Sequence, residues 1–406
     1  MKIALVNLPS SFLINDRVFP PLGILYIATS IRKLGYEIEF YDLAGKSEEE
    51  LKEVYINEEF VFITLTTPQV PIARLFIEEL LKKDKKKIVV GGCGVVSLDE
   101  DFPCDIVVKG DGENLVRSII DLLNMSKDSK TPLYKIIEDQ SGVNIKTTYP
   151  ARDLIKDYNY LLEGRRTTTM LSSRGCCYKC TYCVDSSRQL QMLPVLNAYK
   201  EINQISKLGW KAVMFFDDIF TLKLDRLRQI AYYLRHKDLL YRCFTHVNFV
   251  KPELCEILAE TNCREVGIGI ESGSSKILQT VKKGFEPEKA VEAIKLLKDH
   301  GVKVKTFFMV GLPGENEETI NETKSFIEES QPDDMDFSVY VPFPGTSLYD
   351  SKNTYDISWN SQLTHFKGKT GDYKTTVSTS ALSSERIIKI RDDLEVEFKP
   401  SNRNVT

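Results

Sequence analysis

Four cysteines lie within eight residues near the middle of the chain, and three of them, Cys176, Cys180 and Cys183, have the spacing C-x-x-x-C-x-x-C. Thiolates at such spacings are ligands for iron–sulfur clusters or zinc. Three thiolates can hold three irons of a four-iron, four-sulfur (4Fe-4S) cluster and leave the fourth iron open, whereas electron carriers commonly fill all four positions with cysteine. The three cysteines therefore predict a 4Fe-4S cluster whose open iron binds a substrate.

A structural zinc knuckle is the alternative for the same residues. It needs a fourth ligand, and no partner C-x-x-C or H-x-x-x-H motif follows in the sequence. Cys177 could be that ligand, although adjacent cysteines fit one tetrahedral ion poorly. The remaining cysteines lie in strand-like or helical sequence, where a small buried apolar side chain is the expected role; they are Cys93, Cys104, Cys243, Cys255 and Cys263.

The cysteine cluster directly follows the first strand of a long alternation of strands and helices. The expected strands are residues 166–171, 211–216, 242–247, 265–270, 302–310 and 336–341, with helices between them. Six strand–helix units are too few for a closed eight-stranded barrel, so a partial (β/α)6 barrel is predicted over residues 166–349. The active site of such a barrel lies at the carboxyl ends of its strands.

The first 124 residues show a separate alternation, which predicts a doubly wound α/β domain with a parallel sheet. Its expected strands are residues 2–8, 36–43, 60–67, 87–92 and 105–110, and its expected helices are 21–35, 69–83 and 113–123. Polar, irregular sequence then predicts a linker over residues 125–165. Residues 350–406 are expected to form a short C-terminal extension with one helix at 384–398.

Composition and charge limit which cellular location and which binding partners are expected for the protein. The formal net charge is −4, and neither nucleic acid nor an anionic lipid surface is an expected partner of such a chain. The N-terminus does not resemble a signal peptide, and no apolar run approaches the ~18–20 residues that span a bilayer. Bunched cysteines without an export signal indicate metal binding in a reducing compartment. The sequence therefore predicts a cytoplasmic protein.

Residues from about Thr167 to Tyr349 resemble the radical S-adenosylmethionine (SAM) superfamily. The resemblance rests on the cysteine motif, on Tyr182 directly before the last cysteine, and on motifs at the ends of the later strands. It implies that SAM chelates the open iron through its amino and carboxylate groups. One electron from a flavodoxin- or ferredoxin-type donor would then cleave SAM to methionine and a 5'-deoxyadenosyl radical, which abstracts hydrogen from an unactivated carbon.

In that superfamily the strand-end segments contact SAM, and the resemblance extends this role to seven residues here. A carboxylate such as Glu271 can accept ribose hydroxyls or the methionine ammonium, while Asp218 could instead cap a helix. An exposed or capping position is also the alternative for Glu271, because burying it without a partner would be costly. The seven residues are Asp217, Asp218, Gly269, Glu271, Ser272, Gly311 and Pro313.

The N-terminal segments VFPPLGILYIATSIRKLGYEIEFYDL, VVGG at 89–92 and VVKGDGENLVRSII at 107–120 resemble the cobalamin-binding domain that precedes many radical SAM enzymes. The implied cofactor contacts are Gly91, Gly92, Gly110 and Gly112, although glycines that merely end strands would look the same. Cys93-Gly94 stands where the family usually shows proline and histidine, and Asp111 replaces a glutamate.

All four histidines lie outside this domain, so a cobalamin bound there has no axial imidazole from its own domain. Either the cobalt lacks that ligand, or the domain keeps the fold without the cofactor.

The implied function is that of a radical SAM enzyme that transfers a methyl group from cobalamin to an unactivated carbon. Rearrangement, cyclisation and cobalamin-independent radical chemistry are alternatives. A methylthiotransferase would need three N-terminal cysteines for a second cluster, where only Cys93 and Cys104 are present. A non-catalytic cluster sensor would not need the SAM-contacting motifs. The short C-terminal extension favours a small molecule or a short peptide end as substrate.

Overall fold

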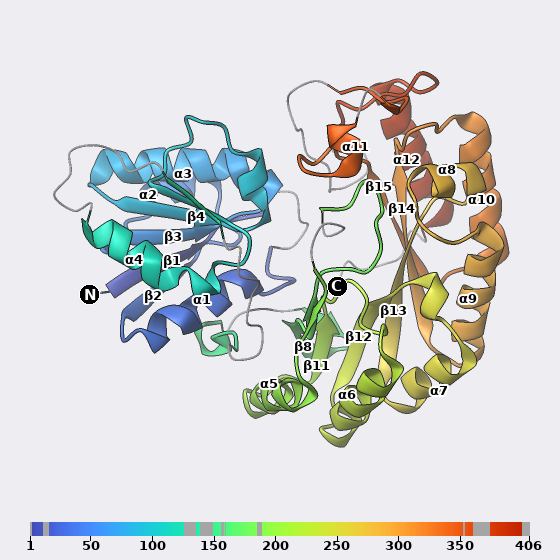
Figure 1. Ribbon diagram of the computed structural model, residues 1–406, viewed down its shortest axis with the longest axis horizontal. Coiled ribbons are helices and arrows are strands. Elements are labelled where there is room, and N and C mark those ends of the chain that lie inside the picture. The colour runs from blue at the N-terminus through green and yellow to red at the C-terminus, as the bar shows by residue number, and fades with distance from the viewer. Residues whose placement is uncertain are drawn as a thin grey trace. The chain divides into compact units, whose positions relative to one another are not determined.

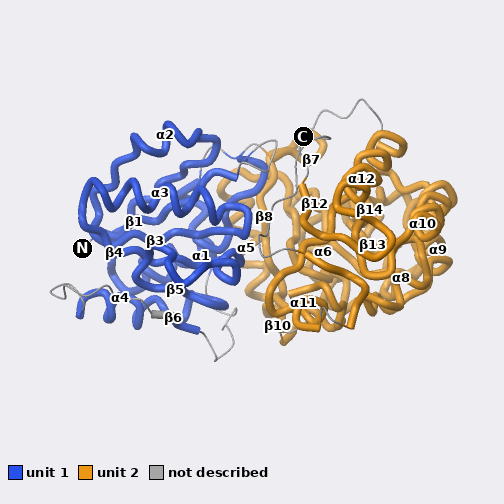
Figure 2. Tube along the Cα trace, turned by 90° about the horizontal axis from the view of Figure 1, so that it is seen from above, with its two compact units in different colours: residues 1–159 blue, residues 160–406 orange. Residues whose placement is uncertain are grey.

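The computed structural model describes residues 2–10, 16–125, 135–138, 149–155, 158, 160–184, 189–351, 354–359 and 374–399. The chain divides into two compact units, residues 1–159 and 160–406 (Figure 2). Most of the expected linker and much of the C-terminal extension, including His365, lie outside the described residues.

Unit 1 is built on a parallel sheet with the strand order β2-β1-β3-β4-β5-β6 (Figure 1). Its strands and helices are β1 (Lys2–Asn7), α1 (Leu22–Lys33), β2 (Glu37–Asp42), α2 (Glu48–Glu53), β3 (Phe60–Thr64), α3 (Val70–Lys83), β4 (Lys87–Gly91), β5 (Ile106–Lys109), α4 (Val116–Met125) and β6 (Lys135–Glu138). The predicted strands and helices are confirmed to within a few residues. β6 falls in the expected linker, because four residues between polar loops carry too little periodic signal to reveal a strand.

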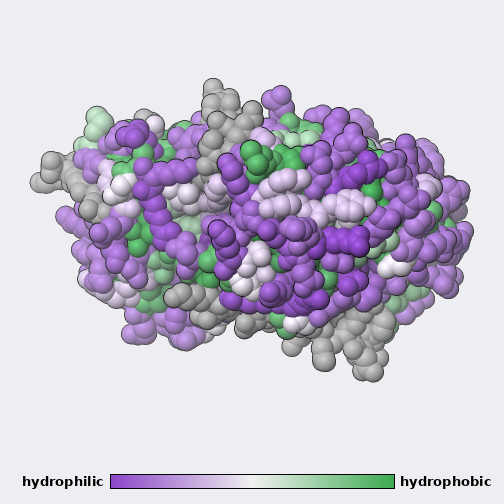
Figure 3. All heavy atoms as spheres, turned by 90° about the horizontal axis from the view of Figure 1, so that it is seen from below, coloured by the Kyte–Doolittle hydropathy of each residue, from purple (hydrophilic) through white to green (hydrophobic). Residues whose placement is uncertain are grey.

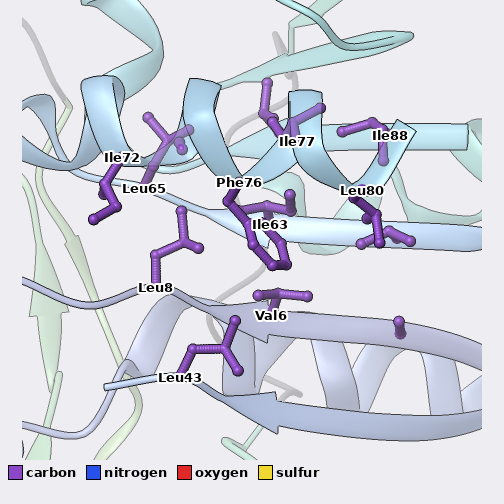
Figure 4. Close-up of a cluster of buried hydrophobic side chains, with 14 of the residues drawn as sticks. Val6, Leu8, Leu43, Ile63, Leu65, Ile72, Phe76, Ile77, Leu80 and Ile88 are labelled. Atoms are coloured by element: carbon purple, nitrogen blue, oxygen red, sulfur yellow. The ribbon is translucent and has the colours of Figure 1, made fainter. Parts of the chain in front are cut away.

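Helices cover both faces of this sheet, as a doubly wound fold requires. On one face α2 and α3 pack on β1, β3 and β4, and Figure 4 shows Phe76 of α3 over Ile63 and Val6. On the other face α1 and α4 pack on the alternate residues of the same strands. The central strands β1, β3, β4 and β5 are buried on both faces and mostly apolar, which is why their positions were predictable from the sequence.

Unit 2 is a curled sheet with the order β15-β14-β13-β12-β11-β8-β7, and helices lie on its convex side (Figure 1). All neighbouring strands pair in parallel except β7 and β8. The strands are β7 (Leu161–Leu162), β8 (Arg165–Met170), β11 (Ala212–Phe215), β12 (Leu240–Thr245), β13 (Cys263–Glu271), β14 (Lys303–Val310) and β15 (Asp334–Val339). Helices α5 (Val195–Lys207), α6 (Leu224–His236), α7 (Pro252–Glu260), α9 (Pro287–Asp299), α10 (Glu317–Ser330) and α12 (Ser384–Phe398) follow the six parallel strands. The partial barrel is therefore confirmed.

The two faces of these strands differ in burial. In β14 the residues Val304, Thr306, Phe308 and Val310 are buried, and Phe308 contacts Phe326 of α10. The alternate residues of β14, from Lys305 to Met309, are half-buried. Because side chains alternate across a strand, this second set lies on the concave face of the sheet. The concave face is thus the one that remains open to a ligand.

The surface seen in Figure 3 is mostly hydrophilic, with apolar residues in small separate groups. Among the residues that the structure describes, none of the helices combines the length and the apolar character that crossing a bilayer requires.

Candidate active site

The cysteines lie on a loop that leaves the end of β8, here called the cluster loop (residues 171–184). Its base is closed where β9 (Ser173–Arg174) pairs antiparallel with β10 (Gln191–Met192). Farther along, the amide of Thr181 donates to the carbonyl of Val281 at 3.1 Å, and the amide of Leu348 donates to the carbonyl of Thr181 at 2.8 Å. The cluster loop is therefore held by segments that follow β13 and β15.

The four cysteines of the loop differ in burial. Cys180 is buried, Cys176 and Cys183 are half-buried, and Cys177 is exposed. Burial raises the pKa of Cys176 and of Cys180, while the Tyr178 amide, 3.5 Å from the sulfur of Cys176, acts in the opposite direction. Within the described ranges no three His, Cys, Asp or Glu side chains already stand together as ligands of a single ion.

The donors on this loop fit an iron–sulfur cluster. Thiols must lose their protons to bind metal, and the Tyr178 amide and the ammonium of Lys283 favour the thiolate form of Cys176 and Cys180, respectively. The thiolates of Cys176, Cys180 and Cys183 would each bind one iron of a 4Fe-4S cluster.

Glu271 joins the end of β13 to the cluster loop. Lys283 Nζ donates to its Oε1 at 2.7 Å, and the hydroxyl of Tyr182 donates to the same oxygen at 2.9 Å. The side chains of Lys283 and Glu271 are only 8% and 10% exposed. Glu271 is therefore neither a helix cap nor a solvent-facing carboxylate, and the exposed alternative is wrong.

The backbone around Glu271 is shaped for this contact. The pairing register with β14 shifts between Gly269 and Glu271. The φ of Glu271 is 71°, in the left-handed region that residues other than glycine rarely adopt. A Cβ at Gly269 would lie 2.6 Å from Oε1 of Glu271 and 3.0 Å from Nζ of Lys283. Strain of this kind persists where the surroundings over-determine it, as at ligand sites.

Lys283 was missed by the sequence reasoning, because in Lys282-Lys283-Gly284 it looks like one of many surface lysines. Lys282 and Gly284 both have positive φ, at 55° and 82°, and they turn the chain so that Lys283 points inward. Burial alone would lower the pKa of Lys283, but the Glu271 carboxylate and the Cys180 thiol outweigh it and raise the pKa. Lys283 therefore places a cation beside the cluster loop.

Asp217, at the end of β11, lies beneath the cluster loop and is fully buried. The amide and hydroxyl of Ser172 donate to its carboxylate at 2.7 and 2.6 Å, and the hydroxyl of Ser173 donates at 2.5 Å. Arg226 of α6 donates to the carbonyls of Ser172 and Leu193 at 2.6 and 3.1 Å, which links the start of the cluster loop to the segment after β10. Burial raises the pKa of Asp217, opposed by these serine donors and by Arg226.

Asp218 follows on an exposed turn, where its charge acts to raise the pKa of Cys176. The N-cap of the next helix, α6, is Lys223, so Asp218 does not cap that helix.

The other expected SAM contacts lie in the turns after β13 and β14. The hydroxyl of Ser272 is 3.3 Å from that of Thr323 of α10, so this side chain faces the helix. Gly311 has φ 92°, and its amide donates to Glu315 Oε2 at 2.6 Å. Pro313 is buried in the same turn. Burial raises the pKa of Glu315 to about 8.

His246, at the end of β12, is a second residue that the sequence reasoning did not single out. Its ring stacks on that of Tyr178 in the cluster loop with 3.7 Å between ring centroids. Nδ1 accepts from the amide of Asn248 at 3.2 Å, so Nε2 carries the proton and donates to the carbonyl of Lys283 at 3.1 Å. Burial lowers the pKa of His246 to about 4, and the ring is therefore neutral near pH 7.

The glycines expected to contact cobalamin lie where β4 and β5 end in unit 1. Gly92 has φ 103°, and a Cβ there would lie 2.5 Å from the carbonyl oxygen of Leu65, so Gly92 is required by close packing of the loops after β3 and β4. A Cβ at Gly112 would lie 3.2 Å from Ile27, and one at Gly91 would lie 3.7 Å from Val108. Gly110 has φ 79° at the end of β5.

The strand order places the topological switch point between β1 and β3, where doubly wound sheets bind cofactors. Gln69 bridges the loops at this point: its side-chain nitrogen donates to the carbonyl of Leu8 at 2.9 Å, and its oxygen accepts from the amide of Thr66 at 2.9 Å. Cys93 is exposed in the turn after β4. A cobalamin at this edge of the sheet would be held by these loops and would take no histidine from unit 1.

Comparison with known proteins agrees with this division of the chain. The family model of the radical SAM superfamily matches residues 170–327, and that of the B12 binding domain matches residues 16–120. An uncharacterized methyltransferase of Pyrococcus horikoshii is 27% identical over 434 residues, which cover 98% of this chain and 92% of that protein. A protein of Methanocaldococcus jannaschii, provisionally named as a methylthiotransferase, is 27% identical over 349 residues, covering 81% of this chain and 76% of that protein.

Among solved structures, the radical SAM methyltransferase TsrM from Kitasatospora setae, with cobalamin and a [4Fe-4S] cluster bound, superimposes with a TM-score of 0.68. The match covers 86% of this chain and 74% of that chain at 18% identity. At 18% sequence identity this structural similarity establishes the fold alone.

Proposed function

The chain is a radical SAM enzyme with a B12-binding domain ahead of its barrel, and from that premise we propose that it is a cobalamin-dependent methyltransferase. The observation that carries the proposal is the pairing of a cysteine loop at the carboxyl end of a barrel strand with a cobalamin-type domain in one chain. The name of the Pyrococcus horikoshii relative, which spans nearly the whole chain, supports methyl transfer over rearrangement or cyclisation.

The cluster and SAM together supply a radical able to take hydrogen from an unactivated carbon, and cobalamin supplies the methyl group. The chain's own residues position these groups. Cys176, Cys180 and Cys183 would hold the cluster, and Tyr182, through its hydrogen bond to Glu271, fixes the cluster loop against β13. Neutral His246 supports the loop by stacking on Tyr178.

SAM binds along the strand ends beside this loop. We assign its polar contacts to the segment from Gly269 to Ser272, and its further contacts to the exposed Asp218 and to the turn at Gly311 and Pro313. Glu271 is the best supported of these, because its carboxylate is already in contact with the cluster loop. Asp217 has a different role: its three donors all come from the base of the cluster loop, so it positions that loop.

A methylthiotransferase is the alternative that the name of the Methanocaldococcus jannaschii relative raises. That chemistry would call for a second cluster on three cysteines of unit 1, which contains two. The number of cysteines in unit 1 therefore favours a bound cobalamin over a second iron–sulfur cluster in this unit.

The substrate is a small molecule or a short peptide end, and the one-electron donor is a flavodoxin- or ferredoxin-type protein. Nine free thiols suit a reducing compartment, so the proposed location is the cytoplasm.

The test is anaerobic reconstitution with iron, sulfide and cobalamin. The proposal predicts that the protein binds cobalamin in a base-off form, without histidine nitrogen couplings in the cobalt(II) spectrum, because unit 1 contains no histidine. Failure to bind cobalamin while SAM is still cleaved would leave a radical SAM enzyme and remove the case for methyl transfer. Histidine hyperfine structure would contradict the axial-ligand argument.

A further inference from the structure

Two phenylalanine rings meet on the concave face of the barrel sheet. Phe244 of β12 and Phe307 of β14 have ring centroids 5.8 Å apart and are both half-buried. Gly267 of β13 lies between them, and a Cβ there would be 2.6 Å from the Phe244 ring and 3.0 Å from the Phe307 ring. The central strand thus contributes no side chain, and the two rings close over it. We call Phe244, Gly267 and Phe307 the ring platform.

The ring platform lies inside the barrel below the cluster loop. Gly267 precedes Glu271 by four residues on β13, which is about 13 Å at the rise of ~3.3 Å per residue of a strand. Glu271 is the residue whose carboxylate contacts the cluster loop through Tyr182. The rings therefore lie on the concave face of the sheet, about 13 Å along β13 from the residue that contacts the cluster loop.

The charged residues beside the rings are paired with one another. Arg242, two residues before Phe244, forms an ion pair of 2.7 Å with Glu265. Lys305, two residues before Phe307, lies 2.9 Å from Asp336 and 3.3 Å from Asp334. Both cations have carboxylate partners, and the Lys305 ammonium also lies 5.7 Å from the centroid of the Phe307 ring, so neither cation beside the rings lacks a counter-charge.

We infer that the ring platform binds a planar, uncharged group of the substrate, so that the substrate class is a molecule or short peptide carrying an aromatic or conjugated ring. The inference rests on the proposed function, which places the substrate in the barrel. Half-exposed aromatic side chains in a concave site are typical surfaces for ligand binding, and flat groups gain from offset stacking on such rings. A charged substrate group bound here would lie beside the Arg242–Glu265 and Lys305–Asp336 ion pairs, whose charges already compensate one another.

The experiment measures binding of indole, a planar uncharged probe, to cluster- and cobalamin-loaded protein by anaerobic saturation-transfer NMR, with cyclohexylmethanol as a non-planar comparison. Phe307→Leu keeps the apolar volume and removes the ring, and it is expected to weaken indole binding roughly two- to tenfold, the effect of losing one aromatic pair. Phe307→Tyr restores the ring and is expected to restore the affinity. Gly267→Ala, whose Cβ displaces both rings, provides a second route to the same loss.

The affinity of the same preparations for SAM separates the outcomes. Weaker indole binding in Phe307→Leu and Gly267→Ala, with unchanged affinity for SAM, supports the inference. Indole affinity that is the same in every variant overturns it, as does a wild type that shows no preference for indole over cyclohexylmethanol. An equal loss of SAM affinity also overturns it, because the adenine of SAM would then occupy the rings. Absence of SAM cleavage by the wild type would instead overturn the proposed function.

Discussion

Replacing Lys283 with methionine tests the contact that joins β13 to the cluster loop. The change keeps the length of the side chain and removes the ammonium group that donates to Glu271 at 2.7 Å. With only 8% and 10% of the two side chains exposed, the Glu271 carboxylate would be left buried beside a methionine. Removing one partner of a buried ion pair costs about 3–5 kcal/mol. In a unit the size of residues 160–406, that corresponds to a fall in Tm of about 6–20 °C.

Thermal unfolding followed by circular dichroism, on metal-free and on cluster-loaded protein, measures this shift. The pairing of the charges is tested by a second variant, Glu271→Gln, and by the double variant with both changes. Because the double variant has no buried charge left at the site, it is expected to recover more than half of the loss caused by Lys283→Met. A Lys283→Met protein that melts within about 1 °C of the wild type, or losses that simply add in the double variant, would refute the reasoning.

Three further changes test separate parts of the site. Asp217→Asn replaces one acceptor oxygen of the carboxylate that receives three hydrogen bonds from the base of the cluster loop, so iron bound per chain is expected to fall while the loaded fraction keeps its affinity for SAM; a selective loss of SAM affinity would make Asp217 a ligand after all. The Glu271→Gln variant, which keeps an acceptor oxygen for Tyr182 and Lys283, should leave the cluster absorbance intact and weaken SAM binding, measured by equilibrium dialysis; unchanged affinity would limit Glu271 to holding the loop. Glu315, whose pKa is about 8 in the folded protein and 4.5 unfolded, keeps a proton that the unfolded chain releases, so its contribution to stability falls as the pH rises from 4.5 to 8. Denaturant unfolding of Glu315→Gln relative to wild type should therefore show a gain that grows by up to about 1.4 kcal/mol per pH unit over that window, and a difference independent of pH would contradict it.

The fold was largely predictable because most of its strands are buried. A buried strand appears in the sequence as a local run of apolar residues. Both faces of the central strands of unit 1 are covered, so apolar runs such as that of β4 mark these strands directly in the sequence. The six parallel strands of the barrel were also located to within a few residues. β6 was not predicted because an edge strand of four residues, with two apolar residues, is too short to show a periodic pattern.

The site was predictable only where local spacing carries the chemistry. Cys176, Cys180 and Cys183 lie within one loop, so their types and spacing suffice. Lys283 and Asp217 owe their roles to partners that the sequence does not place beside them. Asp217 accepts hydrogen bonds from Ser172, which lies 45 residues earlier in the sequence. Lys283 reaches Glu271 because a turn directs its side chain into the interior.

The structural roles of some glycines could not be distinguished from the sequence. Gly92 and Gly267 look alike in the sequence, as glycines in or at the end of a strand. In the structure Gly92 allows the loops after β3 and β4 to pack closely, whereas Gly267 makes room for two rings. Only the neighbours across the sheet separate these roles.

Anaerobic assay of 5'-deoxyadenosine formation from SAM, with a one-electron reductant, tests the central claim most directly. The reconstituted wild type is predicted to carry a 4Fe-4S cluster and to release 5'-deoxyadenosine and methionine. Cys176→Ala, Cys180→Ala and Cys183→Ala should each lose both the iron–sulfur absorbance and the product, while Cys177→Ala, which changes an exposed thiol, should retain both. A loaded wild type that forms no 5'-deoxyadenosine, or a Cys177→Ala variant as inactive as the other three, would contradict the account.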